Sequence, residues 1–488
     1  MTPRTGPADL LPFALALAVL TVFYAGVLAT NRLDLHPDEA QYAVWSRDLA
    51  FGYYSKPPMI AWSIRAMRGV CGEGELCVRL TATLLQAAAA CFVAWAGTRL
   101  AGARVGVLAG VAYATLPMTA FSSLFVTTDA PVCLFAAAAL AFAIGALQTD
   151  RWRDWLALGA SFGLGLMSKY SMALMVLAWW LYLASCPSTR PRLRSAKHFA
   201  ALMLALALFV PNLAWNAAHG FPTLAHTAEI SQLDRPRFAL AELGLFLLGQ
   251  IAVLGPLLAF VLARGIVAKP RNMAAEPFRL PATVFLLPLL LFTALAAVSR
   301  ANANWTAFAL PAAALLVVLL ACADGRERML ATAVAVNLCA VIGFALLPHA
   351  LRVLPIELEG RWNPAARLAG WNALGSEVRA RLQASPELVL MSDERLAAAE
   401  LLYYARPRAL VMWNPGGRVT DHFRLMHDVA AHPGADVLFV TRATDPAQLH
   451  ASFEAVEALP PIVVDRGREK PLELRVYRAR GFKGYRAP

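Results

Sequence analysis

Long apolar runs dominate this chain and limit what it can fold into. A helix needs about 20 mostly apolar residues to cross the hydrocarbon core of a bilayer. Only 16% of the residues are charged, against about 25% in soluble domains. The sequence therefore predicts an α-helical polytopic membrane protein with about eleven transmembrane helices. The predicted spans are 10–30, 79–99, 105–126, 130–148, 155–167, 170–186, 198–215, 240–263, 281–298, 304–322 and 329–348.

Two of these runs are open to two interpretations. The stretches 155–167 and 170–186 could be two short helices or one bent span. Lys169 lies between them, and an uncompensated charge at mid-bilayer costs about 3 kcal/mol. A turn is therefore predicted at Lys169, where the charge can reach the interface. The first run exceeds the ~7–15-residue apolar core of a signal peptide, so we expect a retained helix.

The charges of the connecting segments predict the orientation. Cytoplasmic loops of membrane proteins carry an excess of Lys and Arg. With a cytoplasmic N-terminus, fifteen basic residues fall inside, whereas the outer loops after the first carry only Lys169, Arg235, Arg237 and Arg300. The net charge of +12 then reflects topology, and no nucleic-acid-binding motif is present. We expect a protein of the inner (plasma) membrane with its C-terminus outside.

The chain changes character after residue 348. Residues 1–348 form the predicted transmembrane domain, and residues 349–488 read as a small extracytoplasmic α/β domain. Helical patterns at 394–404 and 446–457 alternate with short β-branched or apolar runs. Those runs are 388–391, 409–412, 437–441, 462–464 and 472–477. This domain has no Gly-rich phosphate loop.

Five polar clusters fall on the predicted outer side of the membrane. They are 36–62, 127–131, 168–170, 215–221 and 299–305. Carboxylates and cations at a membrane boundary are costly, and they are functional candidates by default. A carboxylate can act as a general base, and Lys or Arg can bind phosphate. Together with Asn, Tyr and Trp side chains, these groups indicate sugar transfer from a lipid phosphate.

The motifs His36-Pro-Asp-Glu-Ala-Gln-Tyr and Gly52-Tyr-Tyr-Ser-Lys-Pro-Pro-Met, followed by Trp62, resemble those of the C-type glycosyltransferases of families 39 and 83. These families include the protein O-mannosyltransferases and the aminoarabinose transferase that modifies lipid A. The resemblance extends to Asp129-Ala-Pro, Lys169-Tyr and Asn304-Trp305. It implies an inverting transferase that uses a polyprenyl-phosphate sugar and modifies lipid A, another polysaccharide or a protein outside the cytoplasm.

The resemblance also assigns roles by position. It implies that Asp38 is the catalytic carboxylate of an Asp-Glu pair with Glu39, that Lys56 contacts the donor phosphate, and that Asp129 is a second acidic site residue. The remaining expected substrate-binding residues are Tyr54, Lys169, Tyr170, Asn216, His219, Arg300, Asn302, Asn304 and Trp305. Some relatives place a metal-binding carboxylate where this chain has Ser55, so we do not expect a metal.

Each assignment has a structural alternative. Asp38 and Asp129 could be helix N-caps, and Lys56 and Lys169 could reach toward lipid phosphates. Gly159 and Gly163 predict close helix packing, and Cys71 and Cys77 could form a disulfide in an extracytoplasmic loop. A flippase of polyprenyl-linked glycans is the rival function, although it predicts polar residues at mid-bilayer and on both faces.

Overall fold

The structure, a computed structural model, describes residues 7–232, 238–353, 366–443, 446–466 and 469–486. Arg235 and Arg237 lie outside these residues. By its contacts the chain divides into two units. The first comprises Met1–Thr30 with Lys56–Leu347, and the second comprises Asn31–Ser55 with Pro348–Pro488. The first loop thus groups with the C-terminal residues, whereas the predicted boundary at residue 348 separates them. That two-domain division stays a prediction.

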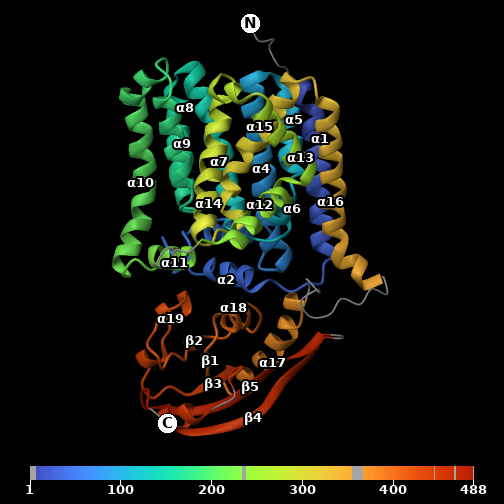
Figure 1. Cartoon of the computed structure of the whole chain (residues 1–488). Coiled ribbons are helices and arrows are strands. Elements are labelled where there is room, and N and C mark those ends of the chain that lie inside the picture. The colour runs from blue at the N-terminus through green and yellow to red at the C-terminus, as the bar shows by residue number, and fades with distance from the viewer. Residues whose placement is uncertain (1–6, 233–237, 354–365, 444–445, 467–468, 487–488) are drawn as a thin grey trace. The chain divides into compact units, whose positions relative to one another are not determined.

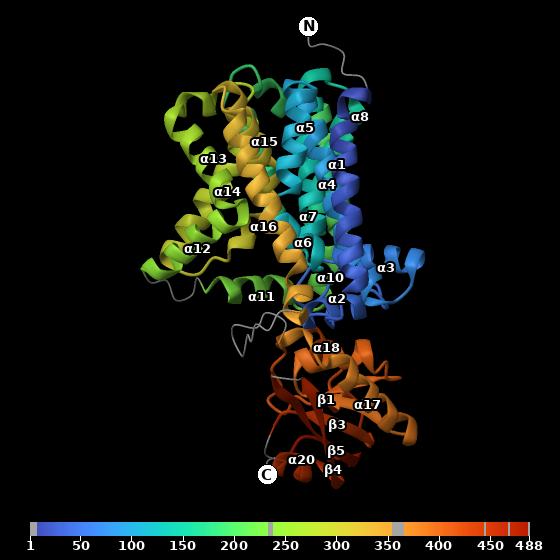
Figure 2. The same cartoon turned by 90° about the vertical axis from the view of Figure 1, so that its right-hand side faces the viewer.

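The first unit is a bundle of apolar helices (Figures 1 and 2). Among the described residues, seven helical segments are long and apolar enough to cross a membrane. Two further candidates are bent helix pairs. The seven are α1 (Pro7–Thr30), α4 (Glu75–Ala101), α7 (Asp129–Thr149), α10 (Ala196–Ala218), α14 (Arg279–Val298), the 3₁₀ turn η3 (Ala303–Ala309) continued by α15 (Leu310–Ala323), and α16 (Glu327–Val353). A multi-span helical fold, as predicted, is therefore confirmed.

The number of full spans is lower than the eleven predicted. Helix α5 (Ala103–Ala114) meets α6 (Pro117–Leu124) at 59°, and α12 (Leu240–Leu254) meets α13 (Pro256–Ala268) at 105°. Proline opens the second helix of each pair and cannot continue the backbone hydrogen-bond ladder. Counting each bent pair as one span gives up to nine spans in the described chain.

The two remaining predicted spans are helical but short. Helix α8 (Trp152–Leu166) has 15 residues and α9 (Met172–Ala184) has 13. The turn between them contains Lys169, as the cost of burying its charge predicted. Shorter elements complete this unit: α3 (Met59–Cys71), α11 (Pro222–Ser231), which lies across one end of the bundle (Figure 1), η1 (Arg190–Arg194) and η2 (Pro270–Ala274). Cys71 and Cys77 form a disulfide between α3 and α4.

Gly159 and Gly163 bring α8 against α10, which confirms the predicted close packing. A Cβ added at Gly159 would lie 2.2 Å from the carbonyl oxygen of Ala201, and one added at Gly163 would lie 2.8 Å from that of Ala205. No side chain fits at either position without moving the neighbouring helix.

Replacing Gly159 by leucine should therefore destabilise the bundle by about 1–3 kcal/mol, the usual cost of overpacking. The measurement is the thermal unfolding midpoint of the detergent-solubilised protein. Gly343→Leu on α16 is the control, because a Cβ at Gly343 meets nothing within 4 Å. Equal midpoints for the two variants would contradict the assigned role of Gly159.

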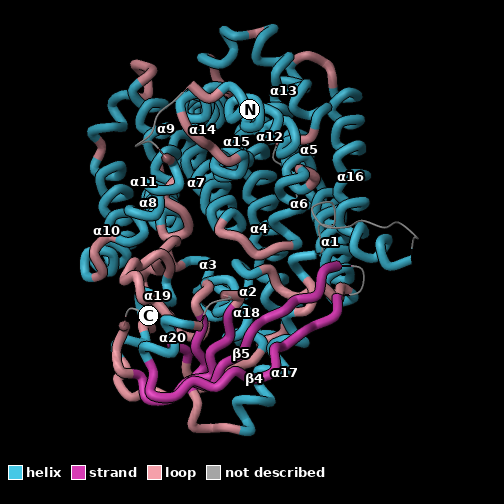
Figure 3. Tube along the Cα trace, turned by 60° about the horizontal axis from the view of Figure 1, so that its bottom comes forward, coloured by secondary structure: helices cyan, strands magenta, loops and turns pink. Residues whose placement is uncertain are grey.

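The second unit contains a mixed five-stranded sheet in the order β2-β1-β3-β5-β4. Strands β1 (Val389–Ser392), β2 (Leu410–Met412) and β3 (Val437–Thr441) are parallel, and β4 (Phe453–Arg466) and β5 (Glu469–Phe482) form a long antiparallel hairpin (Figure 3). Every residue of β3 is buried, as expected for a central strand covered on both faces. The helical elements are α2 (Pro37–Trp45), η5 (Ala366–Leu368), α17 (Trp371–Ala384), α18 (Arg395–Tyr404), α19 (His422–Met426), η6 (Val429–Ala431) and α20 (Ala447–Ser452).

The predicted strands and the helix at 394–404 are present, but the predicted helix at 446–457 is wrong in its second half. Helix α20 ends at Ser452, and Phe453 begins β4. Pairing with β5 starts at once, with Phe453 opposite Phe482 and Glu457 opposite Arg478. The ladder hydrogen bonds and the cross-strand pair of Glu457 with Arg478 (3.2 Å) override the local helical preference.

Candidate functional site

The predicted acidic pair lies at the first turn of α2, in the second unit. His36 is the N-cap residue, and its Nδ1 accepts a hydrogen bond from the backbone N–H of Asp38 at 3.2 Å. The carboxylate of Glu39 accepts from the backbone N–H of His36 at 2.9 Å. Glu39 is buried and completes a capping box. Glu39 therefore has a structural role, and the side chain of Asp38 is not used as the cap.

The carboxylate of Asp38 is bound from α18. Nη1 of Arg395 donates to Oδ1 of Asp38 at 2.9 Å and to Oε1 of Gln41, also at 2.9 Å. The other carboxylate oxygen, Oδ2, lies 4.0 Å from Nδ1 of His36. The side chain of Asp38 is 45% exposed. One oxygen is thus held by an arginine while the carboxylate stays accessible, as a general base requires.

Tyr54 lies in the same unit. Its hydroxyl donates to the carbonyl of Val419 at 3.1 Å, and its backbone N–H donates to Nδ1 of His422 at 3.4 Å. The neighbouring Tyr53 stacks on Trp45 with ring centroids 4.3 Å apart. Burial raises the pKa of Tyr53 to about 12, so its phenol stays protonated and donates to the carbonyl of Trp45 at 3.0 Å. These contacts fix the end of the first loop.

In the first unit, Asp129, Lys169 and Asn304 form one hydrogen-bonded cluster. Nζ of Lys169 donates to Oδ1 of Asp129 at 2.7 Å and to the carbonyl of Asn304 at 3.2 Å. Nδ2 of Asn304 donates to Oδ2 of Asp129 at 2.9 Å. Asp129 is 1% exposed and opens α7, where the helix dipole favours a negative charge. Both its oxygens are engaged, so Asp129 is better suited to orienting Lys169 than to accepting a proton.

A second polar network joins Tyr170 to α10. The hydroxyl of Tyr170 donates to Oδ1 of Asn212 at 2.7 Å and accepts from Nδ2 of Asn216 at 3.1 Å. Oδ1 of Asn216 accepts from the backbone N–H of Thr223, at the start of α11, at 3.2 Å. Both asparagines are fully buried. Asn216 therefore links three segments, and its side chain is engaged within the protein.

Tyr170→Phe should cost about 1–3 kcal/mol of unfolding free energy, because it leaves polar atoms of two buried asparagines without their partner. The midpoint of chemical or thermal unfolding in detergent measures this loss. Tyr182→Phe, which removes a bond to the half-exposed Glu276, is the control and should cost less. The assignment fails if the two variants are equally stable.

Lys56 is half-buried and begins the segment that leads into α3. The backbone N–H of Met59 donates to the carbonyl of Met167 at 3.0 Å. Lys56 precedes Met59 by three positions, and Lys169 follows Met167 by two. The start of α3 therefore adjoins the turn that carries Lys169, which brings two predicted phosphate-binding lysines to neighbouring segments.

The other predicted residues of this unit lie at the C-terminal end of α10 and between α14 and α15. Arg300 and Asn302 are exposed, and Trp305 packs edge-on against Phe292 with ring centroids 5.7 Å apart. His219 stacks on Trp215 at 4.3 Å, and its Nδ1 lies 2.8 Å from the carbonyl of Trp215. Hydrogen bonds thus connect residues of the four predicted clusters within this unit, 127–131, 168–170, 215–221 and 299–305.

Three functional candidates were missed from the sequence. Arg395 stands in an ordinary helical pattern without any motif. Asn212 and Gln250 lie inside apolar runs, where a lone polar residue is a usable signal. Nε2 of Gln250 donates to the carbonyl of Ala303 at 3.1 Å, and its Oε1 accepts from Thr306 at 2.8 Å. Gln250 therefore fixes η3, the element that carries Asn304.

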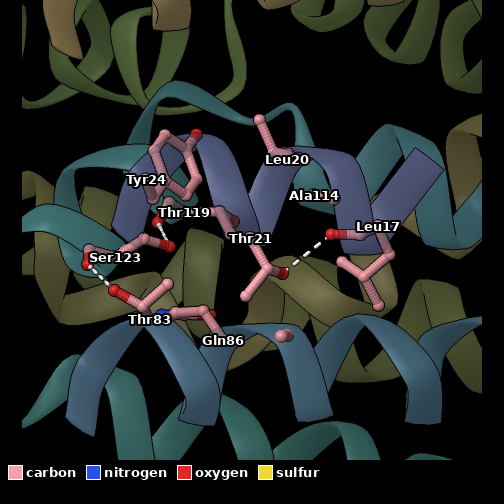
Figure 4. A pocket seen from close by; sticks show the side chains of 10 residues that line it. Leu17, Leu20, Thr21, Tyr24, Thr83, Gln86, Ala114, Thr119 and Ser123 are labelled. Atoms are coloured by element: carbon pink, nitrogen blue, oxygen red, sulfur yellow. Dashed lines mark hydrogen bonds between the residues drawn. The ribbon is translucent and has the colours of Figure 1, made fainter. Parts of the chain in front are cut away.

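A small cleft lies between α1, α4, α5 and α6, away from these residues (Figure 4). Thr83 donates to the carbonyl of Ser123 and Ser123 to that of Thr119, both at 2.7 Å. None of the predicted site residues lines it. Across the described residues, no group of three or more His, Cys, Asp or Glu could hold a metal ion, and Ser55 is no substitute for a carboxylate ligand.

Comparison with known sequences gives consistent matches. The family model described as dolichyl-phosphate-mannose-protein mannosyltransferase matches residues 55–215. The lipid A galacturonosyltransferase RgtD of Rhizobium johnstonii is 30% identical over 90% of this chain and 91% of its own. The undecaprenyl phosphate-α-4-amino-4-deoxy-L-arabinose arabinosyl transferase 1 of Sodalis glossinidius is 30% identical over 68% of this chain and 65% of its own.

Among solved structures, ArnT from Cupriavidus metallidurans bound to undecaprenyl phosphate has a TM-score of 0.67 at 17% identity. The match covers 97% of this chain and 98% of the other. At this identity the likeness concerns the fold, and it extends through the helical bundle and the C-terminal sheet.

Proposed function

The chain belongs to the C-type glycosyltransferases that use a polyprenyl-phosphate-linked sugar as donor, and we propose that it transfers a uronic acid to lipid A. The observation that carries the proposal is the match to a lipid A galacturonosyltransferase over nine-tenths of both chains. Undecaprenyl phosphate is the proposed carrier, since it is the lipid bound by the structural neighbour ArnT.

The charges of the first unit favour an anionic sugar. Three of the predicted site residues there are cations: Lys56, Lys169 and Arg300. Asp129, the one predicted site carboxylate in this unit, is already paired with Lys169. A phosphate and a sugar carboxylate both match this excess of cations, whereas an aminosugar would not.

The proposed reaction is a single displacement. Asp38 takes the proton of a lipid A hydroxyl, whose oxygen forms a bond to the anomeric carbon. The bond from that carbon to the phosphate oxygen breaks, and the polyprenyl phosphate leaves with the electron pair. Lys169, oriented by Asp129 and Asn304, and Lys56 stabilise the phosphate charge as it develops. Attack opposite the leaving group inverts the anomeric centre.

We place the reaction on the extracytoplasmic side of the membrane. Helix α4 runs from the Cys71–Cys77 disulfide to the segment containing Arg99 and Arg104. Disulfides persist in oxidising compartments, and basic loops face the cytoplasm. Both features support an extracytoplasmic position for the disulfide end of α4.

Mass spectrometry of lipid A tests this function. Cells that lack this modification would express either the chain or its Asp38→Asn variant. Lipid A should gain a uronic acid only with the unaltered chain. If lipid A stays unchanged in cells that supply the donor and express the unaltered chain, lipid A is not the acceptor. If lipid A gains aminoarabinose, the transferred sugar is not a uronic acid.

A further inference from the structure

Arg395 occupies a position that its own helix does not favour. It is the first residue of α18, where the partial positive charge of a helix N-terminus opposes a cation. Its N-cap, Glu394, makes no side-chain capping bond and instead pairs with Arg442 at 3.5 Å. The side-chain hydrogen bonds of Arg395 are made instead to residues of α2.

Arg395 contacts two side chains on one face of α2. Asp38 and Gln41 are three residues apart, so they are neighbours on the helix surface. A single nitrogen of Arg395 donates to both, at 2.9 Å each. Gln41 is buried, so the guanidinium is anchored on one side while it holds the partly exposed carboxylate of Asp38 on the other.

The far end of α18 is fixed to the same first loop. Nη1 of Arg47 donates to the carbonyl of Leu402 at 2.8 Å, and the Tyr404 hydroxyl accepts from the backbone N–H of Leu35 at 2.8 Å. A cation at the C-terminal carbonyls of a helix is favourable. Helix α18 is thus bound near both ends to residues flanking Asp38, which defines where Arg395 stands relative to the carboxylate.

We propose that Arg395 is a positioning residue for catalysis, acting through Asp38. It fixes Oδ1 of the carboxylate and leaves Oδ2 to accept the proton of the acceptor hydroxyl. Ionic hydrogen bonds are the stronger and more directional kind, and orientation of a catalytic group contributes heavily to rate. A residue of the segment after position 348 would then contribute to catalysis, and this segment would do more than hold the first loop in place. This inference rests on the proposed role of Asp38.

The test is a double-mutant cycle in proteoliposomes, using an undecaprenyl-phosphate-linked uronic acid and lipid A. Arg395→Ala should lower kcat on the order of 10–100-fold with little change in the KM for the donor. Arg395→Lys should recover part of the rate, since one donor nitrogen makes both contacts. Added guanidinium ion should partly rescue Arg395→Ala. Combining Arg395→Ala with Asp38→Asn should lower the rate no further than Asp38→Asn alone.

Arg442→Ala is the matched control, because it removes the ion pair of Arg442 with Glu394 next to Arg395 and leaves Arg395 itself unchanged; its kcat should equal that of the unaltered chain. Unfolding midpoints establish that each variant is folded. A normal kcat for Arg395→Ala, or a loss that adds fully to that of Asp38→Asn, overturns the role of Arg395. Absence of transfer by the unaltered chain, or full activity of Asp38→Asn, would instead overturn the proposed function.

Discussion

Asp38→Asn should reduce transfer by about 10²–10⁴-fold, the usual contribution of a general base. The amide retains an oxygen that can accept from Arg395 but cannot take the acceptor's proton. The position of α2 should persist, because Glu39 and His36 form its cap without the side chain of Asp38. The loss should therefore appear in kcat, with the KM for the lipid-linked donor nearly unchanged. Single-turnover kinetics in proteoliposomes would measure it.

Asp48→Asn is the control for this variant. Asp48 is an exposed carboxylate of the same loop, and its backbone carbonyl lies 3.1 Å from the hydroxyl of Tyr53. Its replacement should leave kcat within about twofold, as expected of an exposed surface position. Full activity of Asp38→Asn would remove Asp38 from the mechanism.

Asp129→Asn should lower both stability and activity. The carboxylate and Nζ of Lys169 are 2.7 Å apart, and the side chains are 2% and 16% exposed. Removing one partner of a buried ion pair costs about 3–5 kcal/mol, because the other charge is left uncompensated. Lys169 would also lose the orientation proposed for binding the donor phosphate, with a further loss in kcat on the order of 10–100-fold. Unfolding in detergent and activity per folded molecule measure the two effects separately.

The ion pair of Asp154 with Arg99 is the control that separates an effect on stability from an effect on activity. It is also largely buried, with 4% and 14% side-chain exposure and a distance of 3.3 Å. Asp154→Asn should therefore destabilise the bundle while the folded protein keeps its kcat. The double variant Asp129→Asn with Lys169→Met should be more stable than Asp129→Asn alone. A kcat as high in Asp129→Asn as in Asp154→Asn would contradict the role given to Asp129.

The fold could be predicted from the sequence wherever an apolar pattern was long or strongly pronounced. Each predicted apolar run is helical, and the turn at Lys169 and the strand at 437–441 are where the sequence predicted them. The bends before Pro117 and Pro256 were not predicted, because an apolar run does not reveal the angle between its two halves. Residues 453–457 became strand through pairing with residues beyond 477, which a local pattern cannot show.

The site was predictable as a set of residue types but not as a set of partners. Motifs identified Asp38, Asp129 and Lys169, yet nothing in the sequence paired Asp129 with Lys169 across 40 residues. Arg395 lies 357 residues from Asp38, so only the folded chain brings them together. The roles of these residues in catalysis stay predictions until variants are measured.

The most direct test reconstitutes the purified protein with an undecaprenyl-phosphate-linked uronic acid and lipid A, and follows both products. Each molecule of lipid A that gains a uronic acid should be matched by one molecule of released undecaprenyl phosphate, with the new bond inverted at the anomeric carbon. Unmodified lipid A in the presence of intact donor, or retention of the anomeric configuration, would contradict the proposed transfer reaction.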